Sequence, residues 1–229
     1  MVLKRLLIKL SLEQSKTPHP RFAYEFYLKS RHLFNFIERT CLSKLKQRAD
    51  YDTICIDARY GFDAPYMERS AELVYPGALM IVLPFDLAGY QSLTTMGDYY
   101  DFIERILVEG FAIAGDRFAL PQHEVLESFR LFRSEGCENT WSILSKVIDK
   151  ERKLKVQLRG RLTADSFSLE YSLLQGKALV DAQVVFVGEP DELIFAKIVQ
   201  ALYVDQGELV IQGKRGVLKR LPLPASEGL

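Results

Sequence analysis

Hydrophobic positions in the first 135 residues recur at the spacing of helices and of short buried strands. Over residues 21–47 the apolar positions fall at steps of 4 or 7 residues, which keeps them on one face of a helix. Two further helices are expected over 97–114, with Thr94 or Thr95 as the cap, and over 121–134. Apolar runs predict strands over 2–12, 51–59, 71–75 and 78–85.

Beyond residue 150 the pattern changes to alternation, which is typical of strands with one buried face. Leu154, Val156 and Leu158 alternate with charged or amide residues, and 167–171 repeat the pattern after a turn. Further strands are expected over 178–187 and 208–212, and a helix over 189–203. Residues 140–149 fit either a helix or a strand, and their spacing favours a helix.

Predicted hairpins outnumber the crossovers that parallel strands require. The sequence therefore predicts an α+β fold with mostly antiparallel sheets and flanking helices. The change of pattern near residues 135–139 indicates two subdomains: residues 1–135, with a basic helix and an acidic segment, and residues 136–221, an antiparallel sheet with one helix. Residues 222–229 have no periodicity and are expected to form a flexible tail.

The charges are distributed unevenly, although the chain of 229 residues has a formal net charge of zero. Residues 1–48 contain 11 basic and 3 acidic residues, a net charge of +8. Residues 49–116 contain 12 acidic and 3 basic residues, a net charge of −9. Such asymmetry bears on association and on the choice of partner rather than on the fold. The zero balance and the acidic segment argue against a nucleic-acid partner.

No motif for a cofactor, a metal ion or a catalytic nucleophile occurs. Gly110 and Gly115 have the spacing of a phosphate loop, but the lysine and the serine or threonine that contact phosphate and magnesium are missing. The three histidines and three cysteines do not fall at metal-ligand spacing. We therefore expect no cofactor, no metal site and no catalytic residue, and an enzyme is the less favoured class.

The cysteine pattern and the N-terminus indicate a compartment. Three cysteines, an odd number at wide spacing, argue against a disulfide framework. Lys4, Arg5 and Lys9 interrupt the apolar N-terminal stretch, which is therefore not expected to be a signal peptide. No run approaches the ~20 apolar residues that cross a bilayer. We expect a cytoplasmic protein without a membrane partner.

The most enzyme-like segment contains Asp57, Arg59 and Asp63. A carboxylate and a guanidinium at the end of a strand, before a glycine loop, are suited to holding an anionic group. The alternative hypothesis is therefore an enzyme that acts on a phosphorylated or anionic small molecule through these three residues. A plain ion pair explains Asp57 and Arg59 equally well, because both lie on the same side of the strand.

The acidic segment also carries many aromatic residues. Tyrosines supply rigid contact area and carboxylates orient the encounter, so together they suit a basic protein partner. The expected partner-binding residues are Asp57, Tyr60, Phe62, Asp63, Tyr66, Tyr90, Asp98, Tyr99 and Asp101. This interpretation requires that the carboxylates between Ala49 and Asp116 are exposed and are not neutralised by the bases of the first helix.

The favoured function is a non-catalytic, protein-binding inhibitor. Its most concrete form is a cytoplasmic immunity protein that neutralises a cognate bacterial toxin, in which the carboxylates would take the place of substrate phosphates. A further possibility is an oligomerisation module that uses an edge strand of the C-terminal sheet. The sequence itself predicts no particular oligomeric state.

Overall fold

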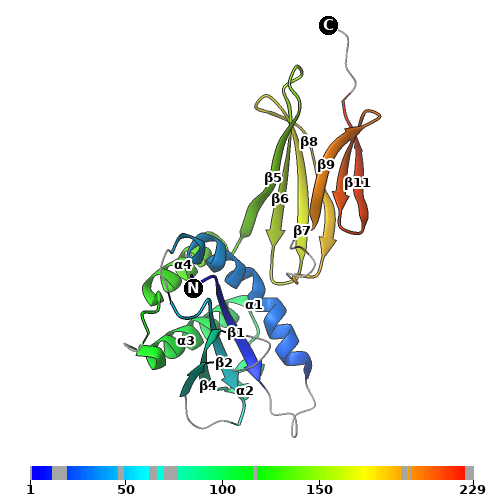
Figure 1. Cartoon of the computed structure of the whole chain (residues 1–229). Helices are drawn as coiled ribbons and strands as arrows, with labels where there is room; N and C mark the ends of the chain where they lie inside the picture. Colours follow the sequence, from blue (N-terminus) through cyan, green and yellow to red (C-terminus); the bar gives the residue numbers. More distant parts are fainter. Residues whose placement is uncertain are drawn as a thin grey trace. The chain divides into compact units, whose positions relative to one another are not determined.

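The computed structural model describes residues 2–11, 20–45, 49–61, 66–69, 77–115, 118–191, 195 and 197–224, with the backbone alone for 20–21 and 66–69. The chain divides into two compact units, Met1–Cys137 and Glu138–Leu229 (Figure 1). The sequence pattern placed this boundary at residue 135. Each unit has its own hydrophobic core and is described by itself.

Unit 1 contains a four-stranded sheet in the order β1-β2-β4-β3. Its strands are β1 (Arg5–Ser11), β2 (Thr53–Arg59), β3 (Tyr66–Arg69) and β4 (Ala78–Pro84). β2 pairs in parallel with both β1 and β4, whereas β3 is antiparallel to β4. Parallel neighbours need a crossover connection, and the long helix between β1 and β2 provides one.

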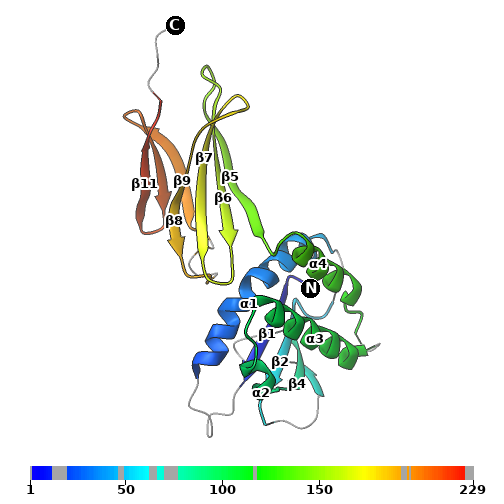
Figure 2. The ribbon, with the colours of Figure 1, turned by 180° about the vertical axis from the view of Figure 1, so that it is seen from behind.

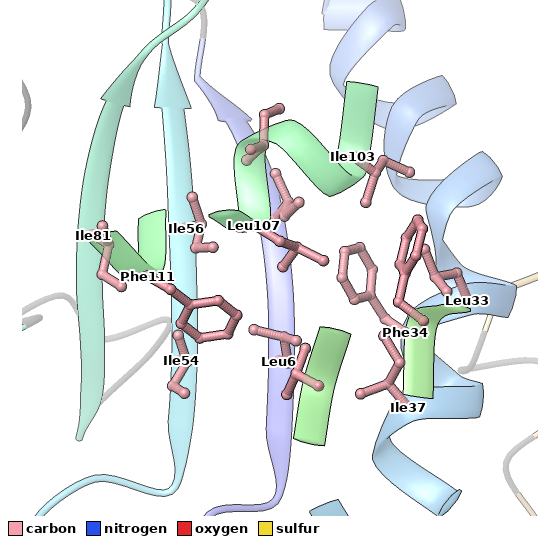
Figure 3. Close-up of a cluster of buried hydrophobic side chains, with 14 of the residues drawn as sticks. Leu6, Leu33, Phe34, Ile37, Ile54, Ile56, Ile81, Ile103, Leu107 and Phe111 are labelled. Carbon is pink, nitrogen blue, oxygen red and sulfur yellow. The ribbon is translucent and has the colours of Figure 1, made fainter. Parts of the chain in front are cut away.

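The helices of unit 1 are α1 (Pro20–Thr40), the 3-10 turn η1 (Leu42–Lys44), α2 (Leu87–Gln91), α3 (Met96–Ala114) and α4 (Gln122–Ser134). In Figure 3, side chains of α1 such as Leu33 and Ile37 point toward Leu6 and Ile56 of the sheet. At Gly110 of α3, an added Cβ would lie 2.8 Å from Cδ1 of Ile56. The missing side chain therefore lets α3 approach β2 closely.

Unit 2 consists of two antiparallel sheets, which can be followed in Figures 1 and 2. The first contains β5 (Asn139–Asp149), β6 (Leu154–Leu162), β7 (Phe167–Gln175) and β8 (Ala178–Gly188) in that order. The second contains β9 (Val199–Asp205), β10 (Glu208–Gly213) and β11 (Gly216–Pro222), with β10 in the middle. Alternate residues of β6 and β7 are buried, as the alternation in the sequence predicts.

The predicted α+β class with dominant sheets and flanking helices is therefore confirmed. The helix expected over 140–149 is wrong, because these residues form β5. Ile143 and Ile148 have no register partner on β6. Extra residues of this kind break the two-residue alternation, so that the apolar spacing resembles that of a helix.

The prediction for residues 189–203 is wrong at its C-terminal end, where β9 begins at Val199. Leu202 is buried there because β9 pairs with β10, a contact that local spacing does not reveal. β11 was not predicted, and it extends to Pro222, inside the expected tail. The strand expected over 71–75 and residues 225–229 of the tail lie outside the described residues.

Candidate functional site: an acidic groove along α3

Two adjoining hollows lie along α3 and share Phe102 and Arg105 in their linings. The first, of about 240 Å³, also contains Asp86 and Glu109, and the second, of about 460 Å³, contains Asp98 and Asp101. We call the two hollows together the α3 groove. Their remaining lining residues are Pro84, Phe85, Gly89, Ser92, Leu93 and Ile106.

Two carboxylates of the groove are fixed because they cap helices. The Asp98 carboxylate accepts hydrogen bonds from the backbone N–H groups of Thr95 (2.8 Å) and Thr94 (3.1 Å), and Thr95 Oγ1 accepts one from the Asp98 N–H (3.2 Å). This capping box confirms the helix start expected at Thr94 or Thr95. These bonds, first of all the one from the Thr95 backbone, lower the pKa of Asp98.

Asp86 serves the same purpose at α2. Its Oδ1 accepts a hydrogen bond from the Gly89 N–H at 2.9 Å. A capping carboxylate keeps one orientation without a partner, so it loses little conformational freedom when a cation approaches. The groove therefore presents two pre-oriented carboxylates, one at each cap.

Arg105 is a basic residue between the two acidic hollows. Its guanidinium lies over the ring of Phe102, with 5.2 Å between Cζ and the ring centroid. In the described part of the chain it forms no ion pair. The lining of the groove thus combines the ring of Phe102, several carboxylates and the guanidinium of Arg105, which borders both hollows.

Arginines of α4 compensate part of the acidic surface. Arg133 Nη1 lies 2.6 Å from Asp101 Oδ1 and 3.6 Å from Glu104 Oε2, and Arg130 Nε lies 3.7 Å from Glu104 Oε1. The Asp101 side chain is still 68% exposed. Exposed pairs of this kind contribute at most about 1 kcal/mol, so a partner can exchange them.

Tyr99 contacts the basic helix instead of standing free. Lys29 Nζ of α1 donates a hydrogen bond to Tyr99 Oη at 3.1 Å and lies 4.6 Å from the centre of its ring. The Tyr99 ring also packs edge-on against Tyr90 at 5.7 Å. In the part of the chain that the structure describes, no base of α1 forms an ion pair with a carboxylate of the groove, but Lys29 holds Tyr99 beside it.

Two of the residues expected on the partner-binding surface are buried. Asp57 has no exposed surface, and its Oδ2 accepts a hydrogen bond from Arg59 Nε at 2.7 Å. It belongs to the face of β2 that also carries Cys55, whose side chain packs near Met80. Tyr90 is 3% exposed within a cluster of aromatic rings, and this burial raises its pKa. The expectation of exposure is corrected for both.

The remaining expected residues are only partly described. Tyr60 is exposed, next to the C-terminal end of β2. The backbone of Tyr66 lies in β3, while Phe62 and Asp63 lie outside the described residues. The structure thus brings Asp98, Tyr99 and Asp101 together on α3, and it places the Asp57 carboxylate against Arg59.

Sequence reasoning missed Asp86, Arg105 and Glu109. A usable signal existed for Asp86, because it follows a buried strand and stands three residues before Gly89, the spacing of a helix cap. In the sequence, Arg105 is one of the three basic residues of the acidic segment 49–116, and nothing there marks it as part of a site. Its place in the groove depends on the packing of α3 beside β4, which no local pattern reveals.

Among the described residues no three His, Cys, Asp or Glu side chains come together in a way that would hold a metal ion. In the same part of the chain no helix combines the length and the apolar character of a membrane span. Neither a protein-family model, nor a curated protein, nor a solved structure matches this chain.

Proposed function

We propose that this chain is a non-catalytic inhibitor that binds a basic segment of another protein in the α3 groove. The observation that carries the proposal is the open groove itself. The carboxylates of Asp86 and Asp98, which cap α2 and α3, line its two hollows, and Phe102 lines both. The most concrete form is a cytoplasmic immunity protein, which would neutralise a cognate bacterial toxin by covering its active or substrate-binding site.

The energetic argument rests on fixed charges. Lysine and arginine side chains of a partner would meet carboxylates that are already oriented, so less freedom is lost on binding. Leu93, which is half-buried and lines the second hollow, would offer apolar contact to the aliphatic part of such a side chain. Asp101 would exchange its exposed pair with Arg133 for a pair with the partner, at little net cost.

A groove with this charge also favours fast association. Complementary charges steer an encounter and raise its rate, and salt weakens the effect because exposed charges are screened. A toxin domain that binds phosphates carries a basic site, and carboxylates would occupy it in place of the phosphates. In this proposal the residues that contact the partner are Asp86, Asp98, Tyr99, Asp101, Arg105 and Glu109. Tyr60, which directly follows the C-terminal end of β2, is exposed.

The test is affinity capture of partners from an extract of the source cells, with wild type compared with Asp86→Asn/Asp101→Asn/Glu109→Gln. Asparagine can still cap α2, so the fold is preserved. A control with the same change of charge is Glu135→Gln/Glu151→Gln/Asp165→Asn, at exposed positions outside the groove. A basic partner should bind wild type and control, and its association rate with the groove variant should fall at least tenfold.

The association rate with wild type should also fall as salt rises from low to physiological concentration. Equal loss of binding in both triple variants would mean that overall charge acts, not the groove. Failure to capture any basic protein would remove the support for an inhibitor.

One observation favours the alternative of an enzyme for a phosphorylated or anionic small molecule. Among the described residues, no donor reaches the buried Oδ1 of Asp57, although Arg59 binds the other oxygen. Both residues lie near the carboxyl ends of the parallel strands β1, β2 and β4, where ligands of such sheets commonly bind. Stabilisation of wild type by inorganic phosphate in thermal unfolding, absent in Arg59→Met, would support this second function.

A further inference from the structure

Strand β8 is an edge of the sheet β5-β6-β7-β8 and pairs, among the described strands, with β7 alone. β11 approaches it without pairing. An edge strand offers a row of free backbone N–H and C=O groups to another strand. Lysine commonly protects such edges, but β8 contains none, and Asp181 is its one charged residue in eleven.

The register with β7 assigns the side chains of β8 to the two faces of the sheet. Residues paired across an antiparallel ladder lie on the same face. The half-exposed face of β7 consists of Ser168, Glu170, Ser172 and Leu174, which pair with Val187, Val184, Ala182 and Leu179. Asp181 and Gln183 pair with the buried Leu173 and Tyr171 and lie on the other face.

The outer face of β8 is therefore an apolar stripe open to solvent. Leu179 is 62% exposed, Val184 is 52% exposed and Val187 is 64% exposed. Leu179 and Val187 are the two most exposed large apolar side chains in the described part of the chain. A stripe of this kind, next to backbone groups with which no described strand pairs, marks an interaction surface.

The stripe is arranged symmetrically along the strand. Leu179 stands four residues before Gln183 and Val187 four residues after it, while Ala182 and Val184 flank it directly. Val180 and Val185, which have no register partner on β7, occur once on each side. We propose that β8 pairs with β8 of a second copy of this chain, antiparallel about a two-fold axis at Gln183. Leu179 of each copy then packs against Val187 of the other.

Charge does not oppose this pairing. Asp181 of one copy faces position 185 of the other, so the two Asp181 carboxylates are separated by about four residues along the strands, roughly 13 Å. This separation exceeds the Debye length of ~10 Å at 0.1 M salt. The pairing also leaves no further β8 edge, so assembly through this contact stops at two copies.

The size of the contact sets its strength. Eleven strand residues extend about 36 Å, and a strip about 10 Å wide covers about 360 Å² of each copy. The total of about 700 Å² is below the ~1,200 Å² at which stable complexes begin. The dimer is therefore weak, and its population depends on protein concentration.

The test is sedimentation equilibrium of the full chain over a range of concentrations. The wild-type mass should rise from that of one chain toward that of two. Leu179→Lys/Val187→Lys places lysine against lysine across the axis and should abolish the rise. Leu179→Lys/Val187→Glu places lysine against glutamate at both contacts and should restore it, which only this register explains.

Val147→Lys is the matched control, because Val147 is 52% exposed on β5 of the same sheet. It should dimerise like wild type, and unchanged Trp141 fluorescence should show that unit 2 is folded in every variant. A wild-type chain that remains a monomer up to roughly millimolar concentration overturns the proposal. The same mass for the two double variants also overturns it.

A cysteine at the axis gives an independent readout. Opposed residues of an antiparallel pair have Cα atoms about 4.5–5.5 Å apart, within the reach of a disulfide. Gln183→Cys should therefore yield a covalent dimer under mild oxidation, whereas Gln200→Cys, exposed on β9, should not. Cross-linking of Gln200→Cys but not of Gln183→Cys would contradict the β8 contact.

Discussion

The Nε2 atom of His32 lies 2.8 Å from the hydroxyl oxygen of Tyr100, and this hydrogen bond joins α1 to α3 inside the core of unit 1. His32 is 1% exposed, and the Phe132 ring of α4 packs edge-on against it with centroids 5.4 Å apart. Three helices thus meet at one buried polar pair.

Acid is expected to destabilise unit 1 through this histidine. Burial lowers the pKa of His32 from 6.5 to about 4. The unfolded chain therefore binds a proton at a higher pH than the native chain, so stability is full above pH 6.5 and is lost as the pH falls toward 4. The expected loss between pH 7 and pH 4 is about 3 kcal/mol.

Urea unfolding followed by far-UV circular dichroism measures this loss, because the described helices α1–α4 all lie in unit 1. His32→Gln should flatten the dependence of unfolding free energy on pH in this range. His123→Gln, at an exposed position of α4, should leave the wild-type slope. An unchanged slope in His32→Gln would show that other groups cause the acid sensitivity.

The hydrogen bond itself should be measurable in Tyr100→Phe. The substitution removes the hydroxyl that is hydrogen-bonded to Nε2 of the buried imidazole, and an unsatisfied buried polar atom costs about 1–3 kcal/mol. The unfolding free energy of unit 1 at pH 7 should fall by this amount. Tyr99→Phe, which removes the half-buried hydrogen bond from Lys29, should cost less than about 1 kcal/mol. Equal costs for the two variants would be inconsistent with a buried pair.

Gly160 should not tolerate a side chain. It faces the core of unit 2 from β6, opposite Trp141 of β5, and an added Cβ would lie 2.8 Å from Cε2 of the indole and 3.1 Å from Cε2 of Phe167. The half-buried indole and the buried Phe167 ring would have to shift to make room, so Gly160→Ala should cost about 1–3 kcal/mol.

Fluorescence of Trp141, the single tryptophan, reports the unfolding of unit 2. Gln157→Ala, on the half-exposed face of the same strand, should change the free energy of unfolding by less than about 0.5 kcal/mol. If Gly160→Ala were as stable as wild type, the Trp141 indole would be able to adopt another rotamer without loss of packing.

The start of α3 should depend on Thr95. Thr95→Ala removes the acceptor of the Asp98 N–H and should lower the unfolding free energy of unit 1 by about 1 kcal/mol. Thr95→Asn keeps an acceptor at the cap and should recover most of that loss. If alanine and asparagine were equivalent, the hydrogen bond from the Asp98 N–H to the side chain of residue 95 would contribute no stability.

Elements with long, regular periods could be predicted from the sequence, and elements shaped by irregular pairing could not. The prediction of α3 over 97–114 differs from the observed Met96–Ala114 by one residue, because a threonine cap, an apolar stripe and Gly115 all agree. β5 was missed because Ile143 and Ile148 interrupt its alternation. The burial of Leu202 depends on β10, which lies later in the chain.

The candidate site could likewise be predicted only in part. Asp98 and Asp101 could be placed together because both belong to one helix. Tyr90 was expected outside because no helix or strand is predicted around it, yet the rings of Phe26 and Phe102 pack against it. Burial of this kind follows from tertiary packing, and a single sequence carries no signal for it.

In the proposed function, the guanidinium of Arg105, which lines both hollows, also bears on which cationic segments the groove would bind. A uniformly cationic tail would bring one of its charges against Arg105 and be repelled there, however well its ends matched the carboxylates. A segment with an acidic residue between two basic ones would match every charge in turn. If the groove binds the partner proposed above, we expect it to discriminate by the order of charges along the ligand, and polyamines or lysine homopolymers should compete poorly for it.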